Sequence, residues 1–320
     1  MKALVLEEKN KHPRYCEYKN PQIGEGEILV QLKAAALNHR DVWITKGLYP
    51  GINPPVILGS DGAGLVDKKE VIINPSINWG EKSTAPGKDY HILGLPTNGT
   101  FAEYLAVNKK QIYPKPAHLT WEEAAALPLS GLTAYRAIFT KGQLKKGDNV
   151  LISGVGGGVA LFAFQLALAA EANVFITSGK EEKIEQAIKM GAKGGVNYKT
   201  EDWDKSLQKL AGGFDLIIDS AAGKGFSKLV KCCNFGARIV IYGGTRGDIS
   251  VLSPQLIFWK QISIHGTSMG NDAEFLAMLE FMNKHKIKPV IDSVYSLKNS
   301  DVAFERIQAG LQFGKVVFSI

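Results

Sequence analysis

Residues 150–167 read VLISGVGGGVALFAFQLA, which is a short apolar strand, a glycine-rich turn and an apolar helix in immediate succession. Glycine at position 154 permits a tight turn with positive φ, and Gly156 and Gly157 allow the backbone to approach a ligand closely. The helix that follows presents unpaired N–H groups and the positive end of its dipole to anions. The stretch therefore predicts a turn that holds the diphosphate of a dinucleotide, with a merely structural glycine turn as the alternative.

The turn departs from the strict G-x-G-x-x-G pattern, because Val159 stands where the third glycine would be. The spacing G-x-x-G-x-x-A, through Gly154, Gly157 and Ala160, fits better and still leaves a small residue for close packing of helix against strand. We take the residues of this turn as candidate phosphate ligands: Gly154, Gly156, Gly157, Gly158 and Val159.

Strands and helices alternate along the chain after this turn. The expected strands are Val150–Ser153, Val174–Thr177, Val196–Tyr198, Phe214–Asp219 and Arg238–Tyr242. The expected helices between them are Ala160–Ala170, Glu181–Met190 and Phe226–Cys233. Strands joined by helices of about ten residues form a parallel sheet through right-handed crossovers. Residues 120–262 are therefore expected to form an α/β domain of the Rossmann type, with a doubly wound parallel sheet.

The chain before residue 120 has a different pattern, with short strands separated by Gly/Pro turns. These strands are expected at Ile28–Lys33, Val56–Leu58, Val71–Ile73 and Phe101–Val107. The pattern indicates a mostly β domain over residues 1–119. Thr120 and Glu123 complete a capping box that begins an alanine-rich helix at the boundary. Residues 263–320 contain a helix, Asp272–His285, and a final strand, Lys315–Ile320, and this segment is expected to return to the first domain.

Composition places the chain among ordinary globular proteins, with 320 residues, of which 45% are hydrophobic and 22% charged. No apolar run reaches the roughly 20 residues that cross a bilayer, and the first ten residues do not read as a secretory signal. Cys16, Cys232 and Cys233 cannot form a disulfide framework, so a reducing cytoplasm is expected. The net charge of +7 is spread as dispersed lysines, which argues against a nucleic-acid partner and favours modest steering of a polyanionic cofactor.

The end of the second expected strand bears on the choice of cofactor. NAD-binding domains carry Asp or Glu there, because a carboxylate grips the ribose 2′-OH. This sequence has Thr177, Ser178, Gly179 and Lys180 instead, which suit the 2′-phosphate of NADPH. Two further residues are expected to complete the phosphate pocket, namely Lys183 and Tyr198. An ordinary Ser/Gly loop with a surface lysine is the alternative.

Several segments together resemble the medium-chain dehydrogenase/reductase superfamily, in particular its zinc-free quinone oxidoreductase and enoyl reductase-like branch. They are AAALNHRDVWITKGLYP, PPVILGSDGAG, NGTFAEYLAV, AAALPLSGLTAYRAI, the glycine turn and GKVVFSI. The resemblance covers essentially the whole chain. It implies a GroES-like catalytic domain beside the Rossmann domain, with an active site in the cleft between them.

Zinc-dependent members of that superfamily read C-G-x-D and G-H-E-x-x-G at two of these places. Here the first is Asn38-His39-Arg40-Asp41, and the second is Gly59-Ser60-Asp61-Gly62. Residues 74–99, which match the structural-zinc lobe of relatives, contain no cysteine. A catalytic zinc needs three good protein ligands, so no metal is expected. Without a Lewis acid, the expected substrate is already electrophilic, namely a quinone or an α,β-unsaturated carbonyl compound.

The resemblance also suggests catalytic and cofactor-binding residues. Asn38 matches an asparagine beside the nicotinamide, although an Asn after an apolar run is often a turn cap. Tyr49 matches a tyrosine that lines the substrate pocket, although a Tyr before Pro is often loop packing. Asp61 is expected either to orient the Asn38 loop or to touch substrate. Thr133 matches a threonine near the cofactor, although a helical threonine also bonds back to its own turn.

Farther along, Tyr242 and Gly243 lie at the end of an expected parallel strand, where open α/β sheets bind their ligands, so they are candidate cofactor contacts. The resemblance adds Thr267 and Ser268, in a segment similar to the one that passes over the nicotinamide, and Lys315. The basic residue near the family C-terminus approaches the adenosine phosphate, and a surface lysine is the alternative reading of Lys315. The segments 238–242 and 263–266 lie where similar proteins pair their sheets, so a homodimer is expected. Two other functions stay open: an enoyl-acyl reductase, and a non-catalytic protein that keeps the cofactor fold.

Overall fold

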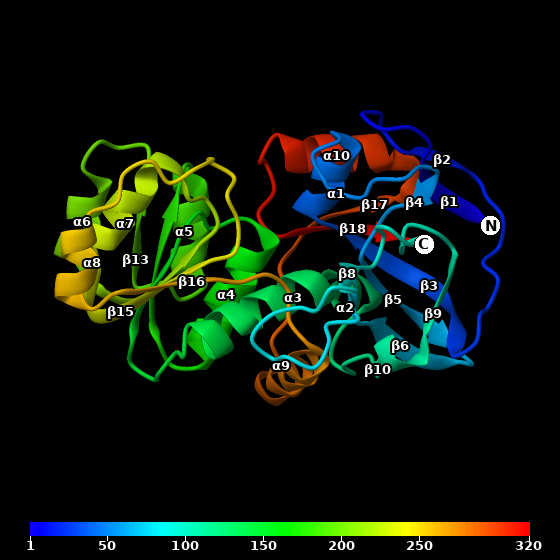
Figure 1. Cartoon of the computed structure of the whole chain (residues 1–320), viewed down its shortest axis with the longest axis horizontal. Coiled ribbons are helices and arrows are strands. Elements are labelled where there is room, and N and C mark those ends of the chain that lie inside the picture. Colours follow the sequence, from blue (N-terminus) through cyan, green and yellow to red (C-terminus); the bar gives the residue numbers. More distant parts are fainter. The chain divides into compact units, whose positions relative to one another are not determined.

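The computed structural model describes all residues, 1–320, and the chain divides into two compact units (Figure 1). Unit 1 comprises residues 1–132 and 270–320, and unit 2 comprises residues 133–269. The last segment thus returns to the first unit, as expected. The first boundary lies after the expected 119/120, because the capped alanine-rich helix α2 (Trp121–Ala126) packs against strands of unit 1. The second lies at 269/270 instead of the expected 262/263. None of the helices is both long and apolar enough to span a membrane.

Unit 1 is built around a seven-stranded sheet with the order β10-β6-β5-β3-β18-β17, in which β9 also pairs with β3. The bounds of these strands are β3 Glu27–Leu37, β5 Asp61–Val66, β6 Lys69–Ile73, β9 Tyr104–Asn108, β10 Ile112–Pro114, β17 Ile291–Ser296 and β18 Lys315–Ser319. Smaller sheets are formed by β1 (Lys2–Leu6), β2 (Arg14–Glu17) and β4 (Val56–Ile57), and by β7 (Ser76–Ile77) and β8 (His91–Ile92).

The helices of unit 1 are short except for one. They are α1 His39–Thr45, α2, the first part of α3 (Pro128–Tyr135), α9 Asp272–His285 and α10 Ser300–Gln308. The predicted capping box of α2 is present, with Thr120 Oγ1 accepting from Glu123 N. The core contains Phe101 and Phe318, whose rings meet edge to face with centroids 5.0 Å apart. Phe101 precedes β9 rather than belonging to it, because its N–H bonds to Leu58 O.

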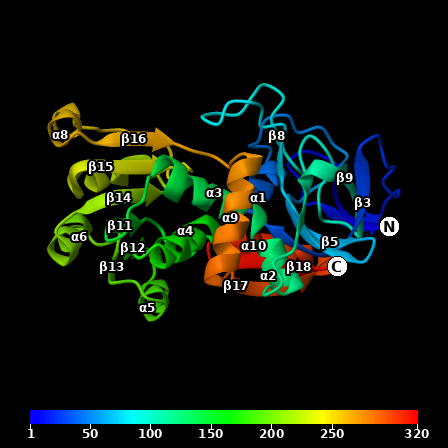
Figure 2. The same ribbon diagram turned by 90° about the horizontal axis from the view of Figure 1, so that it is seen from below.

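Unit 2 contains a six-stranded parallel sheet with the order β13-β12-β11-β14-β15-β16, which confirms the doubly wound α/β class. The strands are β11 Asn149–Ile152, β12 Asn173–Ser178, β13 Gly194–Asn197, β14 Phe214–Asp219, β15 Cys233–Ile241 and β16 Ser263–Gly266. The helices are α4 Gly158–Ala169, α5 Glu181–Lys189, α6 Trp203–Ala211, α7 Phe226–Lys231 and α8 Pro254–Lys260, with a π-helical turn at Arg136–Lys141. Figure 2 shows β16 at one edge of this sheet.

One helix of unit 2 is shorter than the sequence suggests. Helix α7 ends at Lys231, and Cys233 already begins β15 by pairing with Phe214 of β14. The buried apolar surface of Cys232 and Cys233 satisfies the helical and the extended pattern equally well, so the tertiary pairing decides between them.

Candidate active site

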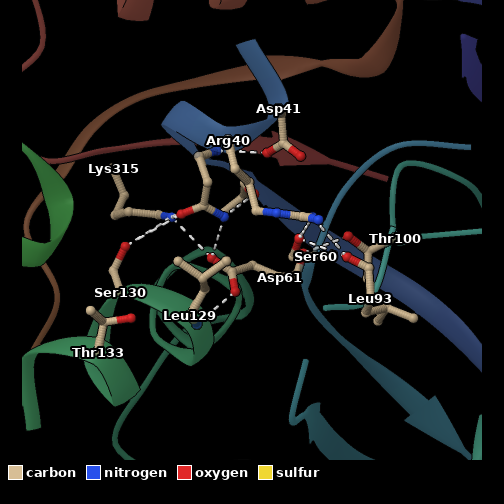
Figure 3. Close-up of polar contacts among 12 residues, drawn as sticks. Arg40, Asp41, Ser60, Asp61, Leu93, Thr100, Leu129, Ser130, Thr133 and Lys315 are labelled. Carbon is tan, nitrogen blue, oxygen red and sulfur yellow. Dashed lines mark hydrogen bonds and ion pairs between the residues drawn. The ribbon is translucent and has the colours of Figure 1, made fainter. Parts of the chain in front are cut away.

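Strand register in unit 1 brings three polar residues to one edge of the sheet. Ala36 of β3 pairs with Asp61, the first residue of β5, and Leu37 of β3 pairs with Val316 of β18. Asn38 directly follows β3 and Lys315 directly precedes Val316. Because β5, β3 and β18 are neighbours in that order, Asp61, Asn38 and Lys315 meet. Figure 3 shows Asp61 and Lys315 side by side, with Ser130 close to Lys315.

The ammonium group of Lys315 lies at the centre of this cluster. Its Nζ donates to Asn38 Oδ1 at 2.6 Å and to Asp61 Oδ2 at 2.9 Å, and lies 3.4 Å from Ser130 Oγ on α3. Lys315 is 3% exposed. This burial excludes the alternative of a surface lysine, and its contacts group Lys315 with the candidate catalytic residues Asn38 and Asp61. We therefore reassign it from the expected adenosine-phosphate contact to this cluster.

Asp61 is held on both carboxylate oxygens. Oδ1 accepts from Leu129 N at 2.7 Å, and Oδ2 accepts from Asn38 Nδ2 at 2.9 Å as well as from Lys315. Thr100 Oγ1 donates to the Asp61 carbonyl oxygen at 2.7 Å. Asp61 is fully buried, so its charge is matched by the ammonium and by two N–H donors instead of by water. Of the two roles expected for Asp61, the orientation of Asn38 is the one that these contacts describe.

A second polar group surrounds Arg40, which follows Asn38 by two residues. Arg40 Nη1 donates to Ser60 Oγ at 2.5 Å and to Leu93 O at 3.0 Å, and Ser60 Oγ donates to Leu93 O at 2.8 Å (Figure 3). The guanidinium carbon lies 5.0 Å from the ring centroid of Tyr49, within cation–π range. Tyr49 thus contacts the second polar group through Arg40, and the role of its hydroxyl stays a prediction.

The donors in this part of unit 1 do not match those that zinc prefers. Zinc is bound in proteins by thiolate, imidazole and carboxylate groups. Asn38 supplies an amide, Ser60 and Ser130 supply hydroxyls, and the single carboxylate of Asp61 is engaged by an ammonium group. No group of three or more His, Cys, Asp or Glu side chains is arranged to hold a metal ion.

Asp41, in the first turn of α1, is a titratable group beside this cluster. Its Oδ2 accepts from Asn38 N at 2.8 Å, whereas its Oδ1 has no hydrogen-bond partner. Complete burial raises the pKa of the Asp41 carboxyl to about 6, even though the neighbouring Arg40 guanidinium acts in the opposite direction. Burial of an ionised carboxylate with one unsatisfied oxygen is costly, so the proton is retained to unusually high pH.

This shift predicts a pH-dependent loss of stability that Asp41→Asn removes. In the unfolded chain the carboxyl loses its proton near its ordinary pKa of 3.8, whereas the folded chain keeps it until about pH 6. The stabilising contribution is therefore complete below pH 4 and is lost as the pH rises to about 6. Two pKa units correspond to roughly 3 kcal/mol of unfolding free energy. Urea titrations at pH 4 to 7 should show a smaller fall in stability for Asp41→Asn than for the unsubstituted protein.

The control for this prediction is Asp67→Asn, which changes an exposed carboxyl at a positive φ of 46° that asparagine also adopts readily. Its pH profile should match that of the unsubstituted protein. If Asp41→Asn also leaves the profile unchanged, the buried carboxyl does not titrate as described.

In unit 2, the glycine turn has the geometry that the sequence predicts. Gly154 and Gly156 have φ of +66° and +131°, and the turn is fixed by Gly154 N donating to Thr177 Oγ1 at 3.0 Å and Val155 N donating to Thr177 O at 2.8 Å. Helix α4 begins at Gly158, and a Cβ added to Gly157 would meet no atom within 4 Å. Bare backbone at the start of a twelve-residue helix fits the diphosphate of a dinucleotide.

The end of β12 is surrounded by cationic side chains. A Cβ built on Gly156 would lie 2.9 Å from Lys183 Nζ, so this lysine covers the glycine turn. A Cβ built on Gly179 would lie 2.6 Å from the Tyr198 hydroxyl and 3.1 Å from Lys199 Cε. The Arg246 guanidinium lies 5.8 Å from the Tyr198 ring centroid. These side chains place positive charge at the end of β12.

Three other predicted cofactor-binding residues of unit 2 are Ser178, Tyr242 and Gly243. Ser178 is buried, and its Oγ lies 3.4 Å from both Val155 O and Lys180 N, so it is part of the turn. Burial raises the pKa of the half-buried Tyr242, which follows β15. A Cβ on Gly243 would lie 2.8 Å from Ser220 O, so only glycine allows this close approach.

The remaining predicted cofactor-binding residues of unit 2 are Thr267, Ser268 and Thr133. Thr267 N donates to Ile241 O at 2.9 Å, but its buried Oγ1 has no hydrogen-bond partner, which leaves a polar atom for a ligand. Ser268 is exposed. Thr133 is buried on α3, and its Oγ1 lies 3.8 Å from Met269 Sδ. The cofactor contacts of these residues stay predictions.

Sequence reasoning missed five residues that the structure adds to the two clusters, namely Arg40, Asp41, Ser130, Lys199 and Arg246. Arg40 and Asp41 lie two and three residues after Asn38, so their proximity along the chain was a usable signal. Ser130 lies three residues before Thr133 on the same helix, and i, i+3 residues share a face. Arg246 lies far along the chain from Tyr198, and nothing in the sequence signals their contact.

Comparisons with known proteins identify the family of the chain. Residues 24–117 match the family described as Alcohol dehydrogenase GroES-like domain, and residues 158–284 match the family described as Zinc-binding dehydrogenase. A zinc-type alcohol dehydrogenase-like protein of Leptosphaeria maculans is 38% identical over 332 residues, which cover 94% of this chain and 92% of that protein.

Solved structures are similar along the whole chain. An NAD-dependent alcohol dehydrogenase has a TM-score of 0.94 at 34% identity, with 100% of both chains covered. A quinone oxidoreductase from Thermus thermophilus, solved also in complex with NADPH, has a TM-score of 0.84 at 25% identity, again with 100% of both chains covered. With a GroES-like unit, a parallel Rossmann sheet and a glycine turn suited to a nicotinamide dinucleotide, the chain belongs to the medium-chain dehydrogenase/reductase superfamily of oxidoreductases.

Proposed function

We propose that this protein reduces a quinone or an α,β-unsaturated carbonyl compound with NADPH, without a catalytic zinc. The observation that carries this proposal is the cluster of Asn38, Asp61 and Lys315. Its amide and ammonium groups are not zinc ligands, and its one carboxylate is already paired with the ammonium. An acceptor that is already electrophilic needs only positioning and hydrogen bonds to take a hydride. The similarity to a quinone oxidoreductase solved with NADPH supports the same acceptor class.

NADPH is preferred to NADH in this proposal because no carboxylate ends β12. Lys183, Lys199 and Arg246 provide positive charge near the glycine turn and Tyr198, where a 2′-phosphate is favoured and a carboxylate would repel it. When bound, the reduced nicotinamide supplies the hydride. The residues of unit 1 then orient the acceptor: Asp61 fixes the Asn38 amide, and Arg40 holds Tyr49.

The test follows the absorbance of the reduced nicotinamide while purified protein is offered a quinone panel, an enone panel and an enoyl-thioester panel. We expect oxidation of NADPH with quinones or enones, no stoichiometric zinc by elemental analysis, and unchanged rates after treatment with a chelator. Faster turnover of enoyl thioesters would identify an acyl reductase. Tight NADPH binding without turnover on any panel would identify a non-catalytic binder and contradict the proposal.

We also propose a homodimer that forms through unit 2. Strand β16 is an edge of the parallel sheet, so its outer backbone groups are available to a second copy. The adjoining α8 exposes Phe258 and Trp259, at 60% and 71%, and Val251 lies just before it, also exposed. Such an apolar patch favours a self-complementary interface. Light scattering should give twice the protomer mass of 34.8 kDa, and Trp259→Lys should shift it toward the monomer. A monomeric unsubstituted protein would exclude this interface.

A further inference from the structure

The hydrogen bonds of the Lys315 ammonium are unequal. Two of them, to Asn38 Oδ1 and Asp61 Oδ2, are 2.6 and 2.9 Å long, but Ser130 Oγ lies 3.4 Å away. An N–H···O bond is ordinarily about 2.7–3.2 Å long. The third N–H of this buried ammonium group therefore forms only a weak hydrogen bond. Ser130 Oγ is itself 3.4 Å from Asn38 Oδ1, so its hydroxyl hydrogen is also weakly bonded.

The surroundings fix the direction of the ammonium group. Asp61 is held by Leu129 N and Asn38 Nδ2, so its Oδ2 cannot turn away from Lys315. Asn38 cannot turn freely either, because its Nδ2 already donates to Asp61. With two of its three hydrogens directed at fixed acceptors, the ammonium presents its third hydrogen in a fixed direction. A preorganised donor of this kind is what stabilises charge that develops during a reaction.

A second buried lysine of unit 1, Lys115, has a close partner in each of three directions around its ammonium group. Lys115 has a side chain that is 6% exposed, and its Nζ donates to Leu119 O at 2.6 Å and pairs with Glu70 Oε2 at 3.1 Å. Its third direction is covered by the ring of Trp121, whose centroid lies 5.2 Å from Nζ. Lys315 has no cation–π partner of this kind among the contacts of its cluster. Buried donors in proteins are nearly always hydrogen-bonded, so a donor as weakly bonded as this one calls for an explanation beyond the ion pair.

We propose that the carbonyl oxygen of the substrate replaces Ser130 as the third acceptor of Lys315, so that this ammonium stabilises the oxyanion formed on hydride transfer. The inference rests on the proposed function and adds a catalytic residue to it. In an enone, the hydride from the dihydronicotinamide forms a new C–H bond at the β-carbon, and the C=C electron pair moves so that the carbonyl oxygen gains a negative charge. That charge meets the Nζ–H of Lys315, and a proton from water at the α-carbon completes the reduction.

Ser130 assists in the same arrangement. Once the oxygen of the substrate has taken the third Nζ–H, the Ser130 hydroxyl can direct its hydrogen to that oxygen as well. Two donors on one developing oxyanion match the requirement of carbonyl chemistry, and each such donor contributes about 10²- to 10³-fold to kcat.

The experiment compares the unsubstituted protein with the double variant Lys315→Met/Asp61→Asn, which removes cation and anion together and leaves no buried unpaired charge. Lys115→Met is the matched control, since it removes another buried lysine of unit 1. On the best quinone or enone, kcat of the double variant should fall about 100-fold, while the Kd for NADPH and the rate of Lys115→Met stay within about threefold of the original values.

A second readout needs no turnover. 4-Nitrophenol, whose anion mimics the oxyanion of a reduced quinone, is titrated by absorbance in the presence of protein and NADP⁺. Its apparent pKa should fall on binding to the unsubstituted protein and to Lys115→Met, but not on binding to the double variant. Equal shifts in all three proteins, or no shift in any, would overturn the assignment of Lys315, as would an unchanged kcat. If the unsubstituted protein reduces no acceptor on any panel but still lowers the apparent pKa of 4-nitrophenol, the proposed function alone is refuted.

Discussion

Ser178→Asp combined with Lys183→Ala should weaken NADPH binding about 100-fold while NADH binding changes by less than about tenfold. The substitutions place a carboxylate at the end of β12 and remove the lysine whose Nζ covers Gly156. A charge-assisted hydrogen bond to phosphate contributes about 1.5–3 kcal/mol, and the new carboxylate adds repulsion toward a dianion. The ribose 2′-OH of NADH accepts such a carboxylate as a hydrogen-bond partner.

Fluorescence titration of both dinucleotides measures this effect, with Lys189→Ala as the control. Lys189 lies in the last turn of the same helix, α5, and is exposed, so its loss changes net charge without touching the turn. The control should bind NADPH as the unsubstituted protein does. If NADH is already the tighter ligand of the unsubstituted protein, the cofactor assignment is wrong and the cations around Tyr198 serve another purpose.

Lys315→Met alone should cost about 3–5 kcal/mol of stability, because it leaves the fully buried Asp61 carboxylate without its cation. Adding Asp61→Asn should restore much of that loss. In the double variant the amide oxygen of residue 61 can accept from Leu129 N. Its nitrogen can donate to Asn38 Oδ1 once the Asn38 amide has turned over, because neither Lys315 nor the Asp61 carboxylate then fixes that amide. The single substitution therefore measures an uncompensated charge, and the pair of substitutions measures the interaction itself.

Urea unfolding followed by circular dichroism gives the midpoints, which are compared in place of a single free energy because two compact units need not unfold together. Lys115→Met is again the control. Its partner Glu70 has a side chain that is 54% exposed and regains water when the lysine is lost, so the expected cost is about 1 kcal/mol or less for the ion pair. A Lys315→Met midpoint equal to that of Lys115→Met would contradict the expected stabilisation by the buried ion pair.

The parts of the fold that local sequence specifies were predicted well. The glycine turn, the strand before it and the helix after it occupy consecutive residues, and the positive φ of Gly154 was predicted from the turn alone. The capping box at Thr120 is equally local. Such features depend on neighbours within a few positions, so pattern and backbone chemistry determine them without knowledge of the tertiary fold.

The candidate site of unit 1 depends on strand register, which the sequence does not reveal. Asn38 and Asp61 were identified through matching family motifs, but Lys315 was assigned to a phosphate because the pairing of Val316 with Leu37 was unknown. A slip of one residue in β18 would turn the Lys315 side chain to the opposite face of the sheet. The contact of Arg246 with Tyr198 was missed for the same reason, since it joins loops that follow different strands of the parallel sheet.

The order in which the chain is synthesised gives the discontinuous unit 1 a distinct history. Residues 133–269 form unit 2 as one continuous stretch, so every strand of its sheet is synthesised before residues 270–320 are translated. Strand β3, in contrast, is made early and lacks β18 until that last segment emerges. Throughout that interval, the Asp61 carboxylate lacks the ammonium group of Lys315. The nascent chain therefore contains all residues of unit 2 before it contains the buried cation of unit 1.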